Sequence, residues 1–580
     1  MKQTPFIIAF CLFCCAAWAQ NLNVYHANLH SHTDYSDAVH QWFPLLYKES
    51  KSPLAAFQHA LWPGGLHVLA VTDHAEQLSP YALDNQPAAE VLGITLWLRH
   101  QHPNEWGETL NQALSATAPG SFVALRGFEW TGHMTDAAGH INVIGSIDYT
   151  GAYGFLQQYQ NLLTPSLSAL YLWLQEHSQA VDGGTVVCQF NHPSSYSHVA
   201  PPFADFRYAP EADRFFTLFE IGSGYKFQPP LLPYRSDYSA PAQNEPWYIR
   251  ALDNGWHLAP TINEDNHTGL YGNQTSHRTG IWASTLNTSE ILGALRVRRV
   301  FATEDSGLSC LFWAEIGGEE KERYLMGYVG VPAAPEITLK ATVTSASKTD
   351  ISSAEVITIG GKKAWQADQS SLPKPEAKTA EWTVRIPYAQ VLPEVEVRPV
   401  GRLTVLVDAS KTRAQGPSRE TYYFLKVQQR DGDLLYSAPI WVQSAASWRP
   451  KRFSFSFGDG SPDYTESADS APDGAFDGRV LHTYAHTGRF QGSVSIEGYY
   501  GETANAQWQL DTENNPVGDV NRDGKVTVSD AVAVLRCALG LITLSAEETA
   551  AADLYPPTGP DGRITIADAV LVLKAAVALW

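Results

Sequence analysis

Two hydrophobic patterns alternate along the first half of the chain. Short apolar runs typical of strands occur at Val24–Leu29, His67–Thr72, Phe122–Phe128, His140–Ile144, Thr185–Asn191, Phe215–Ile221 and His257–Ile262. Stretches with helical periodicity lie between several of them, at Pro53–Leu61, Phe155–Gln179, Glu245–Asn254 and Ser289–Arg298. Seven strands that alternate with helices predict an α/β barrel or a doubly wound sheet.

The pattern changes near residue 320, where helical periodicity fades. Short β-rich runs follow at Glu336–Val343, Glu381–Ile386, Leu403–Val407, Tyr422–Gln428 and Ile440–Val442. They predict a β-sandwich over residues 319–445, packed behind a first domain that spans residues 20–318. The chain is therefore expected to be multidomain, with a linker near Ala445–Pro450 that ends the sandwich.

Two short motifs follow this linker. Residues Phe453–Gly460 have the sequence FSFSFGDG, and Leu481–Tyr484 have the sequence LHTY. The pair resembles the turn and strand signatures of the PKD family of immunoglobulin-like modules. The resemblance implies an immunoglobulin-type β domain over residues 446–515 that serves as a spacer or binding module rather than in catalysis.

Composition narrows the class of function. The chain has 580 residues, of which 44% are hydrophobic, so it can bury real cores and is not generally disordered. Its 60 acidic and 40 basic residues give a formal net charge of -20. Nucleic-acid binding depends on clustered Lys and Arg, so no nucleic-acid partner is expected. Acidic residues can instead serve as metal ligands. Their positions in the sequence decide whether they do so here.

The N-terminus has the features of a secretory signal peptide. Lys2 precedes the apolar run Phe6–Ala17, and Ala17-Trp18-Ala19 provides a small-x-small cleavage site. Residues 1–19 are therefore predicted to be removed from a secreted or extracellular protein. No later stretch reaches 18 apolar residues, so no transmembrane segment is expected.

Histidine is concentrated in the first half of the chain, where 17 of the 19 lie between His26 and His277. Many lie, together with carboxylates, at the ends of predicted strands: His30, His32 and Asp37; Asp73 and His74; Glu129; His140; His192; Asp265 and His267. Residues i and i+2 share one face of an extended segment, so His30 and His32 can bind one ion. In an α/β barrel such strand ends converge on one mouth, which predicts a single metal site.

The ordered motif set over residues 24–310 resembles the PHP (polymerase and histidinol phosphatase) family of metal-dependent phosphoesterases. The resemblance implies a distorted seven-stranded barrel that holds three divalent ions. The implied ligands are His30, His32, Glu129 and Asp265 for the first ion, Glu129, His140 and His192 for the second, and Asp37, His74 and His267 for the third. Asp37 stands where the family often has His, which leaves the metal more open. Asp73 is expected to orient a ligand, and Arg278 is a candidate substrate contact.

The implied chemistry is hydrolysis. Nitrogen and oxygen ligands without thiolate suit Zn, Mn or Fe(II), and clustered ions lower the pKa of a bridging water. No G-x-S-x-G motif offers a serine nucleophile. The leading hypothesis is hydrolysis of a phosphoester substrate.

Other functions stay open. The first domain and its β-rich appendix resemble the exported branch of the PHP family, which includes a carbamate-ester hydrolase. Carbamate or carboxylic ester hydrolysis is therefore the second hypothesis, and a catalytically inactive binding or scaffold-associated protein is the third. Glycoside hydrolysis needs two opposed carboxylates and no metal, which a site rich in histidine disfavours.

The C-terminus carries two copies of a calcium-loop pattern. The first offers Asp519, Asn521, Asp523, Lys525 and Asp530, and the second offers Asp553, Asp561, Arg563 and Asp568. Each copy leads into a predicted helix. The pair resembles a dockerin domain over residues 516–580, which implies bound calcium and a cohesin-bearing scaffold or surface protein as partner. The second loop is four residues longer than the template, which leaves its third ligand position undecided.

Overall fold

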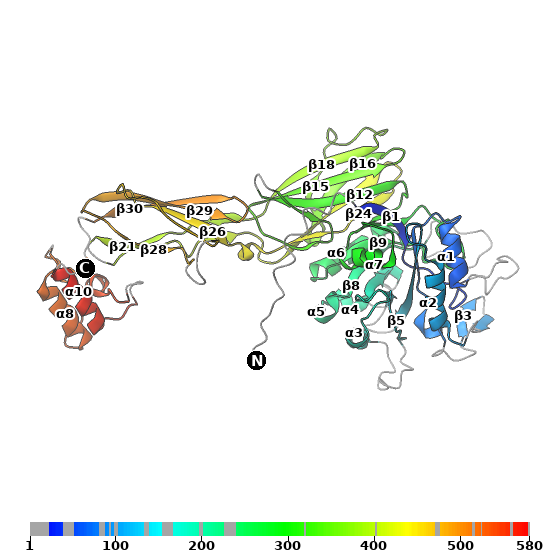
Figure 1. Ribbon diagram of the computed structural model, residues 1–580, viewed down its shortest axis with the longest axis horizontal. Coiled ribbons are helices and arrows are strands. Elements are labelled where there is room, and N and C mark those ends of the chain that lie inside the picture. The colour runs from blue at the N-terminus through cyan, green and yellow to red at the C-terminus, as the bar shows by residue number, and fades with distance from the viewer. Residues whose placement is uncertain are drawn as a thin grey trace.

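The computed structural model describes residues 22–38, 52–79, 87–91, 94–97, 103–132, 139–152, 166–195, 201–224, 239–317, 321–400, 403–469, 476–512, 517–523, 525–556 and 561–577. The predicted signal peptide, residues 1–19, lies outside these ranges. The chain is elongated, with a mixed α/β region at one end, β-sheets in the middle and a small helical region at the other end (Figure 1). We find no membrane-spanning helix within the described ranges.

All seven strands expected in the first half are present. They are β1 (Asn23–Asn28), β2 (Val68–Val71), β5 (Val123–Gly132), β6 (Gly139–Ile144), β7 (Val187–Asn191), β8 (Phe216–Gly222) and β9 (Ala259–Ile262). They lie in this order in one curled sheet, and only β6 runs antiparallel to its two neighbours within this row. The antiparallel direction of β6 places its first residues at the edge where the other strands end.

The predicted barrel is not closed by a continuous hydrogen-bond ladder between its first and last strands. Strand β1 pairs with β2 on one side and with the antiparallel β10 (Arg278–Ala283) on the other, so its edge is not available to β9. The two ends of the row meet beyond the strands, where Ser31 and Asn266 form an isolated parallel bridge. The backbone N–H of His32 also donates to the carbonyl of Asn266 at 2.9 Å. This bridge joins the two ends of the row beside the predicted metal site.

Helices cover the outer face of this sheet. They are α1 (Pro53–Leu61), α2 (Glu105–Ala116), α3 (Leu167–Glu176), α6 (Pro241–Asp253) and α7 (Thr288–Arg296), with short α4 (Phe203–Phe206) and α5 (Pro210–Asp213) and a hairpin of β3 (Pro87–Val91) and β4 (Ile94–Trp97). The side chains of Ser52, Asn104 and Asn287 accept backbone N–H bonds at the starts of α1, α2 and α7. Helices α1 and α2 pack on β2 and β5 through Phe57, Ala113 and Leu69.

The predicted β-sandwich shares its sheet with the first region. Beyond β10 the same sheet continues through β11 (Val300–Thr303), β24 (Leu434–Ser437), β23 (Thr421–Gln429), β25 (Ile440–Val442) and β14 (Val329–Val331), with β16 (Ile351–Thr358) and β17 (Lys362–Gln366) on β23. A second sheet of β13 (Glu322–Leu325), β12 (Leu308–Ile316), β15 (Glu336–Ser345) and β18 (Thr379–Pro387) packs against it. One apolar core includes Leu29 and Val68 as well as Leu339 and Leu425. The predicted boundary at 318/319 therefore does not separate two cores.

The third region is a two-sheet module. One sheet contains β26 (Pro450–Ser456), β27 (Tyr464–Ser467), β29 (Arg489–Gly498) and β30 (Thr503–Asp511), and the other contains β20 (Glu396–Pro399), β21 (Thr404–Asp408) and β28 (Arg479–Thr483). A short pair, β19 (Gln390–Leu392) and β22 (Arg413–Gln415), completes it. The run Leu403–Val407, expected in the sandwich, belongs here because Val405 and Val407 bury against Phe453 and Phe455. The predicted boundary at 445/446 is wrong for this segment.

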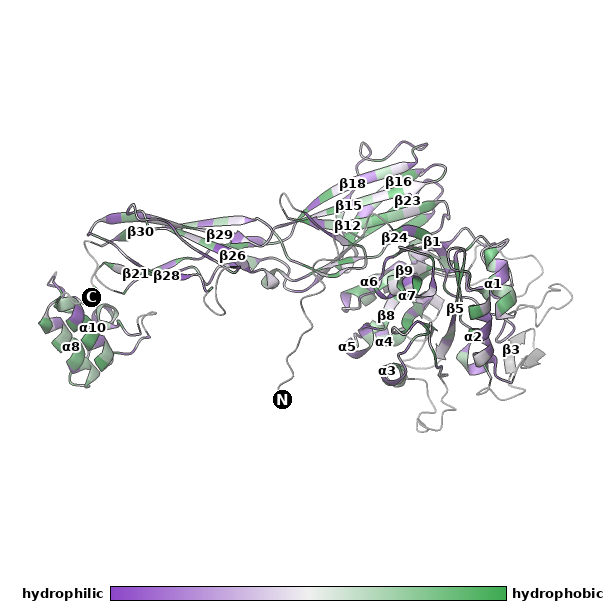
Figure 2. Cartoon of the chain, viewed as in Figure 1, coloured by the Kyte–Doolittle hydropathy of each residue, from purple (hydrophilic) through white to green (hydrophobic). Residues whose placement is uncertain are grey.

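The C-terminal region consists of α8 (Val528–Ala538), α9 (Ala546–Ala552) and α10 (Ile566–Ala576) around a small core of its own. Figure 2 shows hydrophobic residues along α8 and α10. Several of these stay exposed, namely Val528, Val532, Leu535 and Leu539 near α8 and Ile566, Val570, Leu573 and Val577 near α10.

A partly buried histidine, His257, links the first region to the sandwich. The His257 Nδ1 lies 2.7 Å from an oxygen of Asp213, and its Nε2 lies 2.7 Å from an oxygen of Glu420. Burial alone would lower its pKa, but the two carboxylates raise the pKa of His257 to about 9. The imidazolium therefore joins residues that are 207 positions apart (420 − 213).

We predict that this link makes stability depend on pH. Because the folded-state pKa of His257 lies above its ordinary value of 6.5, the stabilisation is complete below about pH 6.5 and is lost as the pH rises through about 9. His257→Gln should lower the free energy of unfolding by about 2 kcal/mol at pH 6 and change it little at pH 10. Urea unfolding at both pH values measures the difference.

The control is His177→Gln, because the His177 imidazole pairs with Asp148 at the surface. Exposed pairs contribute about 0–1 kcal/mol, so this variant should unfold like the parent at both pH values. An equal loss at pH 6 and pH 10 for His257→Gln would show that the side chain stabilises by packing and not by charge.

Candidate metal centre

The structure brings all nine predicted ligands together at one edge of the curled sheet. His30, His32 and Asp37 follow β1, His74 follows β2, Glu129 and His140 lie in β5 and β6, His192 follows β7, and Asp265 and His267 follow β9. Seven of the nine residues are buried, while Asp265 and His267 are partly exposed. The cluster combines six histidines with three carboxylates.

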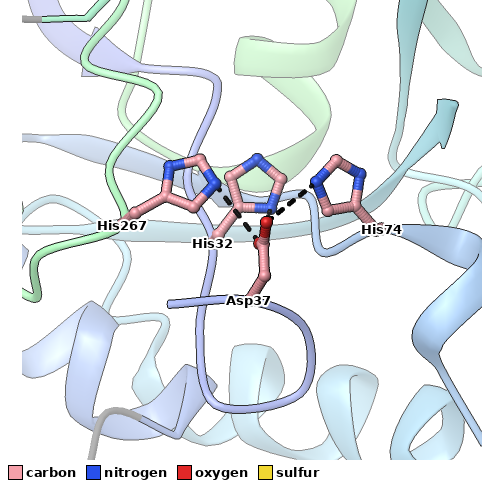
Figure 3. A group of neighbouring side chains, drawn as sticks. All are labelled: His32, Asp37, His74 and His267. Atoms are coloured by element: carbon pink, nitrogen blue, oxygen red, sulfur yellow. Dashed lines mark ion pairs between the residues drawn. The ribbon is translucent and has the colours of Figure 1, made fainter. Parts of the chain in front are cut away.

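Four groups within the cluster have donor atoms close enough to share an ion. They are His32, Asp37, His74 and His267; His30, Glu129 and His192; His30, His32 and Asp265; and His74, Glu129 and His140. Figure 3 shows the first group, with the carboxylate of Asp37 between the three imidazoles. Its oxygens lie 3.2 Å from His267 Nε2 and 3.4 Å from His74 Nε2.

These groups differ in part from the sets that the PHP resemblance implies. The third set gains His32, whose Nδ1 lies 3.6 Å from an oxygen of Asp37. The second set is divided, because His192 groups with His30 while His140 groups with His74. Glu129 belongs to both of these groups.

Glu129 is the centre of the cluster. Its Oε1 lies 3.1 Å from His30 Nε2 and 3.0 Å from His140 Nδ1. Its Oε2 lies 3.3 Å from His32 Nε2 and 3.0 Å from His74 Nδ1. Burial would raise the pKa of this carboxyl, but the surrounding imidazoles hold the pKa of Glu129 well below its usual range. One carboxylate thus lies within 3.3 Å of four histidines, and His192 Nε2 lies 3.7 Å from its Oε1.

The donor atoms fit bound cations. The Nε2 atoms of His30 and His32 face each other at 3.2 Å, and both lie 3.2 Å from Asp265 Oδ1. Among the described residues, Asp37 Oδ1, Glu129 Oε2 and Asp265 Oδ1 are buried without a hydrogen-bond partner. Buried lone pairs that converge in this way are costly unless a cation lies between them. Nitrogen and oxygen donors suit Zn, Mn or Fe(II).

Asp73 orders the turn that carries Asp37. Its carboxylate accepts hydrogen bonds from the Thr33 N–H at 2.6 Å, the Thr33 hydroxyl at 2.7 Å and the Ser36 hydroxyl at 2.5 Å. Burial raises the pKa of Asp73 to about 6, although these hydrogen bonds act to lower it. Asp73 is not in any of the four groups, which fits its predicted part in orienting a ligand.

Arg278 was predicted as a substrate contact, but its guanidinium is bound to the backbone of the chain. Its guanidinium donates to the backbone carbonyls of Gly272 at 2.7 Å, Thr275 at 3.1 Å and His277 at 2.7 Å. The side chain is buried, and it fixes the segment that follows His267. This arrangement indicates a structural part for Arg278.

Three residues that support the ligands were not predicted from the sequence. Asn191 donates to Glu129 Oε1 at 2.8 Å, and the hydroxyl of Thr131 lies 2.8 Å from His74 Nδ1. Glu220, in β8, contacts His30 Nδ1 at 3.0 Å. The signal available was a carboxylate inside the otherwise apolar run Phe215–Ile221, because such a group needs a buried partner.

The two C-terminal loops have matching hydrogen bonds. In the first, the Asp530 carboxylate accepts from the N–H groups of Val520, Asn521 and Thr527. In the second, the Asp568 carboxylate accepts in the same way from Leu554, Tyr555 and Thr565. The N–H groups of Lys525 and Arg563 donate at 2.9 Å to Asp523 and Asp561, respectively. Asp523 and Asp561 are thus equivalent despite the longer second loop.

This equivalence decides the third ligand position. Tyr555 takes the place of Asn521, since the backbone N–H of each donates to the last Asp of its loop. A tyrosine offers no amide or carboxylate oxygen for calcium. Among the described residues, which leave out 557–560, the second loop therefore offers one side-chain ligand fewer than the first.

Comparison with known proteins gives two family matches, and no curated protein matches the chain. Residues 517–576 match the dockerin type I domain, and residues 74–200 match DUF3604, a protein family of unknown function. Among solved structures, one similar chain is a two-domain protein containing a predicted PHP-like metal-dependent phosphoesterase from Bacteroides vulgatus ATCC 8482. The identity is 15% and the TM-score 0.33, covering 67% of this chain and 91% of that chain. The dockerin match confirms the prediction for the C-terminus, whereas the metal centre has to be interpreted from its own geometry.

We predict that the two C-terminal loops bind calcium with unequal affinity. We expect the first loop to bind calcium at least about tenfold more tightly than the second, because Tyr555 replaces a side-chain oxygen ligand. Calorimetric titration should show two steps for the parent chain. Asp553→Ala should remove the weaker step, and Asp519→Ala the tighter one. Removal of the tighter step by Asp553→Ala would contradict the assignment.

Proposed function

We propose that the protein is a secreted metal-dependent hydrolase whose most favoured substrates are phosphoesters. The observation that carries this proposal is the set of overlapping donor groups that share Glu129. Sites that place two or more ions next to each other can hold both the attacking and the leaving oxygen of an ester. Divalent ions bound here would supply Lewis-acid stabilisation of the substrate and an activated water.

The residues of the chain divide this work among them. Glu129 would bridge the ions, and Asn191 keeps the carboxylate in place through its bond to Oε1. Together with Glu129, His30, His32 and Asp265 would hold one ion, and His140 and His192 would hold a second. Asp37, His74 and His267 would hold a third ion. Asp73 would act indirectly by fixing the turn that presents Asp37. Arg278 would keep the segment after His267 in position.

Hydrolysis of a carbamate or carboxylic ester uses the same donor set and is the second candidate. A catalytically inactive binding protein is less well supported, because a barrel that had lost its activity would be expected to lose ligands. All nine predicted ligand positions carry a His, Asp or Glu, and each of these residues belongs to a group whose donor atoms lie within 4.8 Å of one another.

The C-terminal region supports a second, separate part of the proposal. We propose that it binds calcium and docks onto a cohesin-bearing scaffold or surface protein. Its match to the dockerin type I domain and the exposed apolar residues of α8 and α10 support this docking. The enzyme would then act outside the cell, attached through its C-terminus.

Hydrolysis should depend on both metal and Glu129. We expect a chelator to abolish activity on p-nitrophenyl phosphate or bis(p-nitrophenyl) phosphate, and Zn, Mn or Fe(II) to restore it. Asp73→Asn should lower the rate by about 10–100-fold, typical of a residue that orients a ligand, and Glu129→Gln should lower it further. Initial rates, with metal content measured on the same samples, test this expectation.

p-Nitrophenyl acetate and a p-nitrophenyl carbamate serve as comparison substrates in the same assay. Faster turnover of these two would favour the second candidate. Activity that survives complete removal of metal would end the proposal of a metal-dependent hydrolase.

Docking should depend on calcium and on the apolar residues of both repeats. Leu535 and Leu573 are exposed on α8 and α10. Combining Leu535→Gln with Leu573→Gln should weaken binding to an immobilised type I cohesin by about tenfold or more, since each buried leucine contributes roughly 1.5–3 kcal/mol. Leu114→Gln, at an exposed position of α2, is the matched control. Equal binding with and without calcium would contradict this docking mode.

A further inference from the structure

Glu220 is a fully buried carboxylate that none of the four ion groups includes. It lies in β8 between the apolar residues Phe219 and Ile221, and Glu220 is 0% exposed. A buried charge of this kind is costly unless donors surround it. Its contacts therefore indicate what it does.

Among the described residues, each hydrogen-bond partner of the Glu220 carboxylate is a nitrogen. Oε1 lies 3.0 Å from His30 Nδ1 and 2.9 Å from Asn263 Nδ2. Oε2 accepts from the backbone N–H of His192 at 3.1 Å and lies 3.3 Å from His30 Nδ1. Because both oxygens are used in this way, Glu220 faces the back of the ligands rather than an ion.

These contacts reach the ends of three strands. His30 follows β1, His192 follows β7, and Asn263 follows β9 two residues before Asp265. His192 has a φ of +26° and Asp265 a φ of +45°, conformations that non-glycine residues rarely adopt. Such a backbone persists only when its surroundings hold it, and the bond from the His192 N–H to Glu220 is one such restraint.

The contact with His30 also decides which nitrogen of that ring can bind a metal. A hydrogen on Nδ1 that points to Glu220 leaves Nε2 with a lone pair. Nε2 is the atom that lies 3.1 Å from Glu129 Oε1 and 3.2 Å from Asp265 Oδ1. A carboxylate behind a ligating histidine fixes the ring orientation and raises its basicity as a ligand.

We propose that Glu220 is a positioning residue of the metal centre, which orients His30 toward the ions and holds the backbone that presents His192 and Asp265. This inference rests on the proposed metal-dependent function. Asn263 extends its reach, because the Asn263 side chain accepts from the Leu29 N–H at 2.7 Å just before His30. Glu220 thus connects the ends of β1, β7 and β9 through hydrogen bonds.

Glu220→Gln tests this inference with little change in shape. An amide presents one NH₂ where Glu220 has an oxygen, so at least one of its three nitrogen partners would face a donor. We expect affinity for Co²⁺, used as a spectroscopic probe in the metal-free full chain, to fall about 10–100-fold. The visible absorption of the Co²⁺ form should also change, because the His30 ring is no longer held in one orientation.

Glu304→Gln is the matched control. Glu304 is also buried, accepts from the Leu434 N–H at 2.9 Å and has His277 3.8 Å away, but it belongs to none of the ion groups. This variant should bind Co²⁺ with the parent's affinity and spectrum. Glu220→Asp, which keeps the charge on a shorter side chain, should lose less affinity than Glu220→Gln, and it replaces that variant if the amide prevents folding.

The possible results separate the two proposals. A parent chain that binds no Co²⁺ would overturn the metal-dependent function itself. A parent chain that binds Co²⁺, together with folded Glu220 variants of unchanged affinity and spectrum, would overturn only the positioning role. Equal losses in Glu220→Gln and Glu304→Gln would also overturn it, since the effect would then be general destabilisation.

Discussion

Everything in the first region depends on keeping one buried carboxylate, Glu129, in contact with four histidines. Imidazole nitrogens at 3.0–3.3 Å surround both of its oxygens within a largely buried cluster. Such a concentration of polar groups costs free energy unless charges are paired or a cation is bound. The rest of the fold therefore has to supply the free energy that keeps these polar groups together.

The curled sheet meets this constraint by bringing strand ends to one edge. The antiparallel hairpin of β5 and β6 is essential, because it turns the start of β6 toward the ends of the parallel strands and places His140 opposite Thr131. Buried polar residues behind the ligands, Glu220, Asn191 and Asp73, then fix the individual side chains. The ligands and their supports form one connected hydrogen-bonded unit.

Much of this arrangement could be predicted from the sequence, because period-two apolar runs and strand-end histidines are local signals. All seven strands and the convergence of the nine side chains followed from them. The sharing of one sheet by two predicted domains could not be predicted, since it depends on the pairing of β11 with β24, which are more than 130 residues apart. The place of Leu403–Val407 also depends on a distant partner, β28. Glu220 and Tyr555 required knowledge of which backbone N–H groups face them.

The chain passes between the sandwich and the third module three times, after β18, after β22 and after β25. The hydroxyl of Tyr388, in the first passage, donates to the carbonyl of Gln443 in the third at 2.7 Å. The backbone N–H of Ala445 donates to the carbonyl of Pro417, in the second passage, at 2.8 Å. Three connecting segments that are bonded to one another resist bending and twisting far more than a single linker does. The module therefore acts as a stiff arm, which keeps the C-terminal loops at the opposite end of the chain from the candidate metal centre (Figure 1).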